Sequence, residues 1–72
     1  MPVVQVSLKK GRSLEEKRML VERFTLTLVE VCGSVAERVH VIIDEVDEDN
    51  WGRGGRLLSE IATAPGPKKA NE

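Results

Sequence analysis

With 72 residues, a net charge of -1, one cysteine and one histidine, the chain can form no more than one small domain, with neither an internal disulfide nor a Cys/His zinc site. One Trp, one Phe and no Tyr, at near-neutral charge, exclude the basic and aromatic surface that binds nucleic acids. No apolar run approaches the roughly 20 residues that span a bilayer, and the start MPVVQVSL lacks the pattern of a signal peptide. We therefore expect a cytoplasmic protein with a reduced thiol and no membrane partner.

The small size of the chain also predicts an oligomer. A domain of this length buries a small fraction of its surface, and such domains usually gain stability from disulfides, metals or self-association. Cys32 is the single cysteine and His40 the single histidine, so an internal disulfide and a Cys/His metal site are excluded. We therefore expect self-association to supply the additional stability.

The first predicted element is a strand at the start of the chain. Residues 2–8 are rich in β-branched side chains, and apolar and polar residues alternate with the period of a strand that has one buried face. The apolar positions are Val4, Val6 and Leu8, and the polar ones are Gln5 and Ser7.

A helix of about 18 residues is predicted to follow. Ser13 and Glu16 have the spacing of a capping box, in which each side chain accepts a hydrogen bond from the other residue's backbone N–H. Gly33 is a plausible end for the helix. The apolar stripe consists of Leu20, Val21, Phe24, Leu28 and Val31.

Residues 38–46, RVHVIIDEV, predict a second strand, whose largely apolar sequence is typical of a strand covered on both faces. Arg38 and His40 would then point to the same face. A strand, a helix and a strand form a β-α-β unit with parallel strands, so the fold class is α/β. Because two strands do not make a durable sheet, two chains are expected to pair into a four-stranded one.

The remaining residues predict a short, turn-rich end to the domain. The acidic run at 44–49 lacks the glycine and distal Glu of an EF-hand loop, so we expect no metal site there. The sequence WGRGG at 51–55 favours a tight hairpin, and Leu57, Leu58 and Ile61 indicate one more short element. We expect the domain to cover residues 2–61 and residues 62–72 to form a mobile tail.

Taken in order, these residues resemble one family. The chain is similar to the 4-oxalocrotonate tautomerase family in four segments: Met1-Pro2, Gly11-Arg12-Ser13 before a capped helix, Val41-Ile42-Ile43, and Trp51 before Gly-Arg-Gly-Gly. The resemblance covers roughly residues 2–60. It implies a β-α-β fold with a carboxy-terminal hairpin, dimers with a four-stranded sheet, and usually a hexamer of three dimers. It also implies active sites built from more than one chain.

The resemblance implies that Pro2 is the catalytic residue. Removal of Met1 would expose a secondary amine, which takes a proton from an enol or an α-carbon and returns it elsewhere on a conjugated 2-oxo acid. A site lined by Val4, Trp51 and arginines would lower the pKa of this amine toward neutrality by desolvation and by charge. The alternative is a proline that only begins a strand. No cofactor is implied, because the base belongs to the chain.

The substrate-binding residues implied by the resemblance are Arg12, His40, Arg38 and Trp51. Arg12 matches the family's carboxylate-binding arginine. His40 departs from the family, whose best-studied members have a second arginine there; Arg38, or Arg53 in the hairpin, would have to supply the missing cation. Trp51 matches the aromatic residue of the site. Each also has a plain structural alternative, such as a loop charge or a subunit contact.

Three other functions stay open. The same proline supports hydration, dehalogenation or decarboxylation of small unsaturated or oxo acids, with Asp44 or Glu45 as the nearest carboxylates in sequence. The chain also fits a catalytically weak subunit of a mixed hexamer, with His40 marking the lost arginine. A binding module without activity is the third, and retained Met1 would indicate it.

Overall fold

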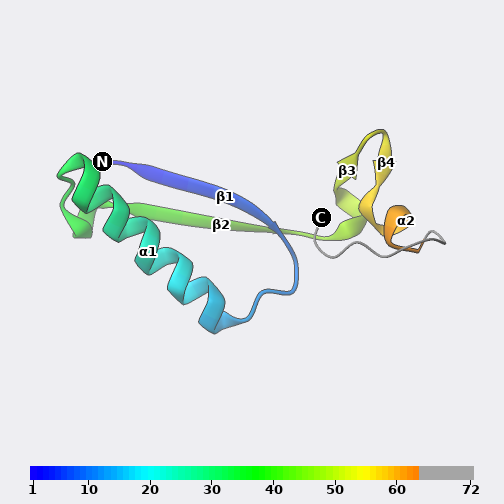
Figure 1. The fold of residues 1–72 in the computed structure, drawn as a ribbon, viewed down its shortest axis with the longest axis horizontal. Coiled ribbons are helices and arrows are strands. Elements are labelled where there is room, and N and C mark those ends of the chain that lie inside the picture. The colour runs from blue at the N-terminus through cyan, green and yellow to red at the C-terminus, as the bar shows by residue number, and fades with distance from the viewer. Residues whose placement is uncertain (64–72) are drawn as a thin grey trace.

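The computed structural model describes residues 1–63. Strand β1 (Val3–Lys9), helix α1 (Leu14–Cys32) and strand β2 (His40–Val46) form the larger part, and the hairpin of β3 (Gly52–Arg53) and β4 (Arg56–Leu57) leads into helix α2 (Leu58–Thr63) (Figure 1). Two 3-10 turns, η1 (Ala36–Arg38) and η2 (Glu48–Asn50), flank β2. The predicted α/β class and β-α-β order are confirmed. Helix α2 runs past residue 61, and the rest of the expected tail, from residue 64, lies outside the described residues.

The two long strands form a parallel sheet in the register Val3↔His40 through Lys9↔Val46. Side chains of paired residues share a face, and exposure alternates along both strands. The half-buried apolar positions on the covered face are Val4, Val6, Leu8, Val41 and Ile43. The opposite face is bare in the single chain, where Ile42 is 47% exposed. The expectation that β2 is covered on both faces therefore fails for one chain alone, since α1 covers one side.

Local signals set both ends of α1. The Glu16 N–H donates to Ser13 Oγ at 3.1 Å, and the Ser13 N–H donates to Glu16 Oε1 at 3.0 Å, so the predicted capping box is present. Gly33 ends the helix at φ 70°, in the left-handed region, and its N–H donates to the Val29 carbonyl at 3.1 Å.

The second strand begins at His40, two residues later than predicted. Arg38 belongs to η1, where its N–H donates to the Val35 carbonyl at 2.8 Å. The reason lies in β1: the register that pairs His40 with Val3 would pair Arg38 with Met1, so β1 has no strand residue left to hold Arg38. The prediction that Arg38 and His40 share a strand face is therefore wrong.

The hairpin has the predicted form. Gly54 and Gly55 join β3 to β4 with φ angles of 63° and 84°, and two consecutive positive φ values fit the tight turns that match strand twist. The Leu58 N–H donates to the Trp51 carbonyl at 2.8 Å and ties α2 to the start of the hairpin.

The single chain lacks a core. Among residues 1–61 no side chain is fully buried, and the sheet has two long strands. Large apolar side chains stay exposed on both the sheet and the helix: Val3 by 55%, Leu14 by 69% and Val21 by 39%. A two-stranded sheet of this kind is marginal alone, so the apolar surface needs a covering partner. Within the described residues, no helix has the length and apolar character to cross a membrane.

Candidate active site

Pro2 lies at the amino-terminal end of the sheet, directly before β1. It is half-buried, and its carbonyl accepts a hydrogen bond from the His40 N–H at 3.0 Å. Met1 is 80% exposed, so the residue before Pro2 makes little packing contact. The ladder between the two strands thus holds the backbone of Pro2 in place whether or not Met1 contributes.

His40 and Arg38 lie at the same end of the sheet as Pro2, but their side chains are placed differently. His40 pairs with Val3 on the bare face. Because side chains alternate along a strand, the Pro2 ring and the His40 imidazole leave the strands on opposite faces. Arg38 is exposed in η1. One chain therefore brings the backbones of Pro2 and His40 together without directing both side chains to one point.

Arg12 and Trp51 lie at the other end of the sheet (Figure 1). Arg12 is in the loop after β1, and Trp51 follows η2, beyond the end of β2. The strands are parallel and seven residues long. At about 3.3 Å per residue, roughly 20 Å separates the two ends, which exceeds the reach of an arginine side chain. The predicted site residues of one chain thus form two separate groups.

Arg12 has a carboxylate neighbour at the start of α1. Its Nη1 lies 3.7 Å from Glu16 Oε2. The hydrogen bond from the Ser13 backbone, followed by the charge of Arg12, lowers the pKa of Glu16. The Glu16 carboxylate therefore stays ionised and belongs to the capping box as much as to Arg12.

The two carboxylates considered for water activation lie toward the Arg12 end of the sheet, far from Pro2 of the same chain. Glu45 forms an ion pair with Lys17 of α1 at 2.9 Å, and Asp44 pairs with Ser7 on the bare face. Like Arg12, they could meet only the Pro2 of another chain.

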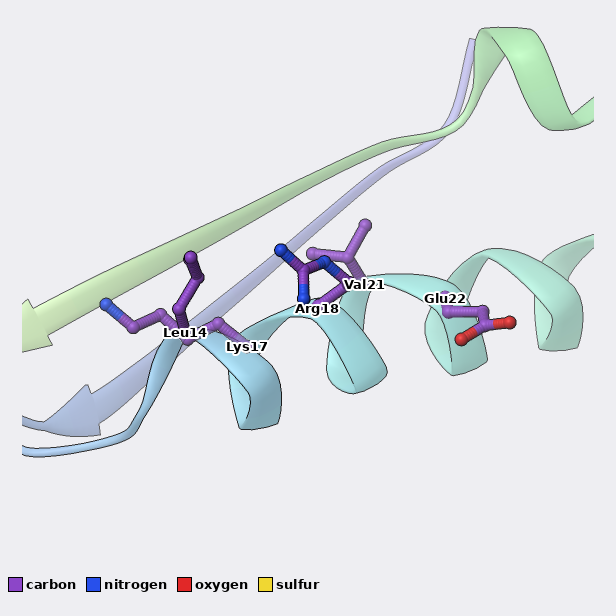
Figure 2. Close-up of a pocket in the computed structure, with 5 residues that line it drawn as sticks. All are labelled: Leu14, Lys17, Arg18, Val21 and Glu22. Carbon is purple, nitrogen blue, oxygen red and sulfur yellow. The ribbon is translucent and has the colours of Figure 1, made fainter.

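Two hollows flank α1. The larger, about 610 Å³, is lined by Leu14, Lys17, Arg18, Val21 and Glu22. Figure 2 shows Leu14, Arg18 and Val21 projecting from the same side of the helix. The smaller, about 260 Å³, is lined by Arg12, Glu16, Met19, Leu20 and Arg23.

Sequence reasoning missed Arg23 as a neighbour of Arg12. The available signal was spacing, since Glu16, Met19, Leu20 and Arg23 recur at intervals of three and four residues and so share one side of a helix. Within residues 1–63, no group of three or more His, Cys, Asp or Glu side chains is arranged to hold a metal ion.

Comparison with known proteins identifies the family. The sequence profile of the tautomerase enzymes matches residues 2–61. A 2-hydroxymuconate tautomerase of Comamonas testosteroni is 38% identical over 61 residues, which make up 85% of this chain and 97% of that protein. The crystal structure of TomN, a 4-oxalocrotonate tautomerase homologue in the tomaymycin biosynthetic pathway, has a TM-score of 0.86 at 35% identity, over 90% of this chain and 100% of TomN.

A further solved structure is a heterohexameric 4-oxalocrotonate tautomerase from Chloroflexus aurantiacus, with a TM-score of 0.79 at 26% identity over 85% of this chain and 98% of that one. These matches extend from Pro2 through the hairpin, and they agree with the element order described above. The chain belongs to the tautomerase enzyme family and is an isomerase.

Proposed function

We propose that the protein isomerises a 2-oxo acid between its enol and keto forms, or between conjugated and unconjugated forms, with Pro2 as general base and acid. The observation that carries this proposal is the position of Pro2, which the His40 N–H fixes at the open end of the sheet in a chain of the tautomerase family. With Met1 removed, the Pro2 nitrogen takes a proton from the enol hydroxyl, and the resulting ammonium returns it to carbon.

The site is completed by a second chain. The hydrogen bonds from the His40 N–H to Pro2 and from the Lys10 N–H to Val46 bracket the ladder between the strands. In a parallel pair this leaves the backbone groups of Val3, Gln5, Ser7 and Lys9 directed to the free edge of β1. Antiparallel pairing of two such edges about a two-fold axis makes a four-stranded sheet and brings the Pro2 end of one chain to the Arg12 end of its partner.

The larger hollow on α1 supports the same pairing. Leu14 is 69% exposed there and lies on the same side of the helix as Val21. Part of the apolar surface of α1 is therefore not covered by the sheet of its own chain. A second α1 lying on the partner's half of the sheet would cover that surface. We propose that three such dimers form a homohexamer; the alternative is a mixed hexamer, an assembly for which the Chloroflexus aurantiacus neighbour is a precedent.

In this assembly the remaining site residues have distinct roles. The guanidinium of Arg12 binds a substrate carboxylate through two hydrogen bonds. His40 and Arg38, contributed from the Pro2 end of a chain, polarise the oxygen on which negative charge develops. Trp51 forms an apolar wall that excludes water and lowers the pKa of the proline amine.

The deciding experiment follows the ketonisation of 2-hydroxymuconate and of phenylenolpyruvate by ultraviolet absorbance. The enzyme is first separated by intact mass into chains with and without Met1. We expect activity in the chains that begin with Pro2, rising with pH as the amine loses its proton, and none in chains that keep Met1. Equal activity in the two fractions, or no turnover of either substrate by the processed chain, would refute Pro2 as the base.

A further inference from the structure

The smaller hollow on α1 places a second arginine beside the carboxylate-binding one. Arg12 and Arg23 both line this space of about 260 Å³, Arg12 from the loop before the helix and Arg23 from its third turn. Neither the strand pattern nor the family resemblance had pointed to Arg23. Because His40 stands where the family's best-studied members have a second arginine, the source of a second substrate-binding cation was still open.

The charges in this hollow favour an anion. The charged residues that line it are two arginines and one carboxylate, that of Glu16, which already accepts the Ser13 N–H at 3.0 Å and lies 3.7 Å from Arg12. Within residues 1–63, no ion pair to Arg23 is found. By contrast Arg18, on the other flank of α1, is paired with Glu15 at 3.0 Å. The hollow thus has a net positive charge and one guanidinium without a counter-ion.

Apolar side chains line the same hollow. Met19 is 39% exposed and Leu20 is half-buried. A flexible thioether side chain adapts to ligands of different shape. Two cations and two apolar side chains around one hollow suit a short carbon chain with a carboxylate at each end, and a single carboxylate would leave Arg23 unused.

We propose that Arg23 is a substrate-binding residue that supplies the second guanidinium for a dicarboxylate. Arg12 binds one carboxylate, Arg23 binds the other, and the carbon chain lies over Met19 and Leu20. The proposal rests on the proposed function, because the hollow is then the part of the shared site that this chain offers to the partner's Pro2. It assigns to Arg23 the second substrate-binding cation, which the family resemblance had suggested for Arg38 or Arg53.

The test compares Arg23→Gln with Arg18→Gln, a matched control on the opposite flank of the same helix. Because Arg18 lines the hollow proposed as the pairing surface, sedimentation velocity first establishes that both variants assemble like the unmodified chain. For each variant, kcat and KM are measured for the dicarboxylate 2-hydroxymuconate and the monocarboxylate phenylenolpyruvate. Loss of a charge-assisted hydrogen bond at an exposed site predicts a fall of about tenfold in the ratio of the two kcat/KM values for Arg23→Gln, mainly through KM. Arg18→Gln is expected to keep the ratio, and Arg23→Lys to restore it in part. An unchanged ratio in Arg23→Gln overturns the proposal.

A binding measurement separates this inference from the proposed function. Isothermal titration of adipate, a saturated dicarboxylate of six carbons, requires no proton transfer. We expect adipate to bind Arg23→Gln about tenfold more weakly than the unmodified chain and Arg18→Gln. Equal affinity for Arg23→Gln and the unmodified chain, or no binding to either, rejects the dicarboxylate role of Arg23, whereas loss of turnover with intact adipate binding rejects only the proposed chemistry.

Discussion

The two ends of the sheet differ in how firmly the single chain holds them. At the Arg12 end, ion pairs join the end of β1 and the loop after it to the segment after β2: Lys9 to Glu48 at 3.2 Å and Lys10 to Asp47 at 3.8 Å. The capping box adds order to the same region. At the Pro2 end, the backbone hydrogen bond from His40 is the main restraint, and Val3 beside it is exposed. Under the proposed function, the chain thus builds the cationic half of the site by itself and leaves the Pro2 end, which would carry the base, open for a partner.

The largest expected effect is the loss of the base at the open end. Pro2→Ala keeps a small second residue, so Met1 is still removed, but it replaces a rigid secondary amine with a flexible primary one. We expect kcat to fall by about a hundredfold or more, in line with the usual contribution of general acid–base catalysis. The thermal unfolding midpoint should hardly change, because Pro2 contributes a carbonyl to the ladder and alanine offers the same group. Steady-state kinetics and a melting curve check both parts; retained activity would place the base elsewhere.

Subunit mixing tests directly whether the two ends meet across chains. Pro2→Ala and Arg12→Gln each disable one half of every site in their own homo-oligomers. If Pro2 and Arg12 of one site come from two partners, each mixed dimer contains one site with both native residues. Random reassortment of equal amounts then restores about a quarter of native activity. If both residues came from one chain, mixing would restore nothing, and the separation seen along the sheet would have no functional meaning.

The proposed pairing surface can be broken without touching either end. Val21→Glu replaces an apolar side chain of the hollow shown in Figure 2 with a charged one, and burial of a charge in the proposed interface is costly even where a cation lies nearby. We expect the oligomer to dissociate at micromolar concentration and activity to disappear with it. Leu26→Glu is the control, because Leu26 is 52% exposed on α1 and lines neither hollow. Sedimentation velocity distinguishes the two variants; equal assembly would move the interface away from this flank.

Features of the fold that depend on neighbouring residues were predicted from the sequence, and features that depend on distant residues were not. The capping box at Ser13, the stop at Gly33 and the Gly54-Gly55 turn depend on neighbouring residues alone, and all were predicted. The start of β2 depends on where β1 begins, so Arg38 was wrongly placed in the strand. The bare face of β2 likewise depends on what packs against it.

The candidate site shows the same division more sharply. Pro2, Arg12, His40 and Trp51 were predicted as single residues, yet their separation into two groups became visible only once the parallel register was known. Arg23 was not predicted, because the hollow that it shares with Arg12 is visible only in the folded chain. Which side chains meet in the finished site is a property of the assembly, and a single-chain pattern carries little of that information.

The smallest expected effect concerns the capping box next to Arg12 and its contribution to stability. The pKa of Glu16 is lowered in the folded chain, first by the Ser13 backbone hydrogen bond and then by Arg12, so its ionised form stabilises the fold. That contribution is fully present above the pKa of the unfolded chain, near 4.5, and is lost as pH falls through the lower folded value. Glu16→Gln retains an oxygen acceptor without the charge, so its melting midpoint should lie slightly below that of the native chain at pH 7 and come closer to it at pH 3. The same difference at both pH values would show that Glu16 acts by hydrogen bonding alone, and that Arg12 is held in place by something other than this carboxylate.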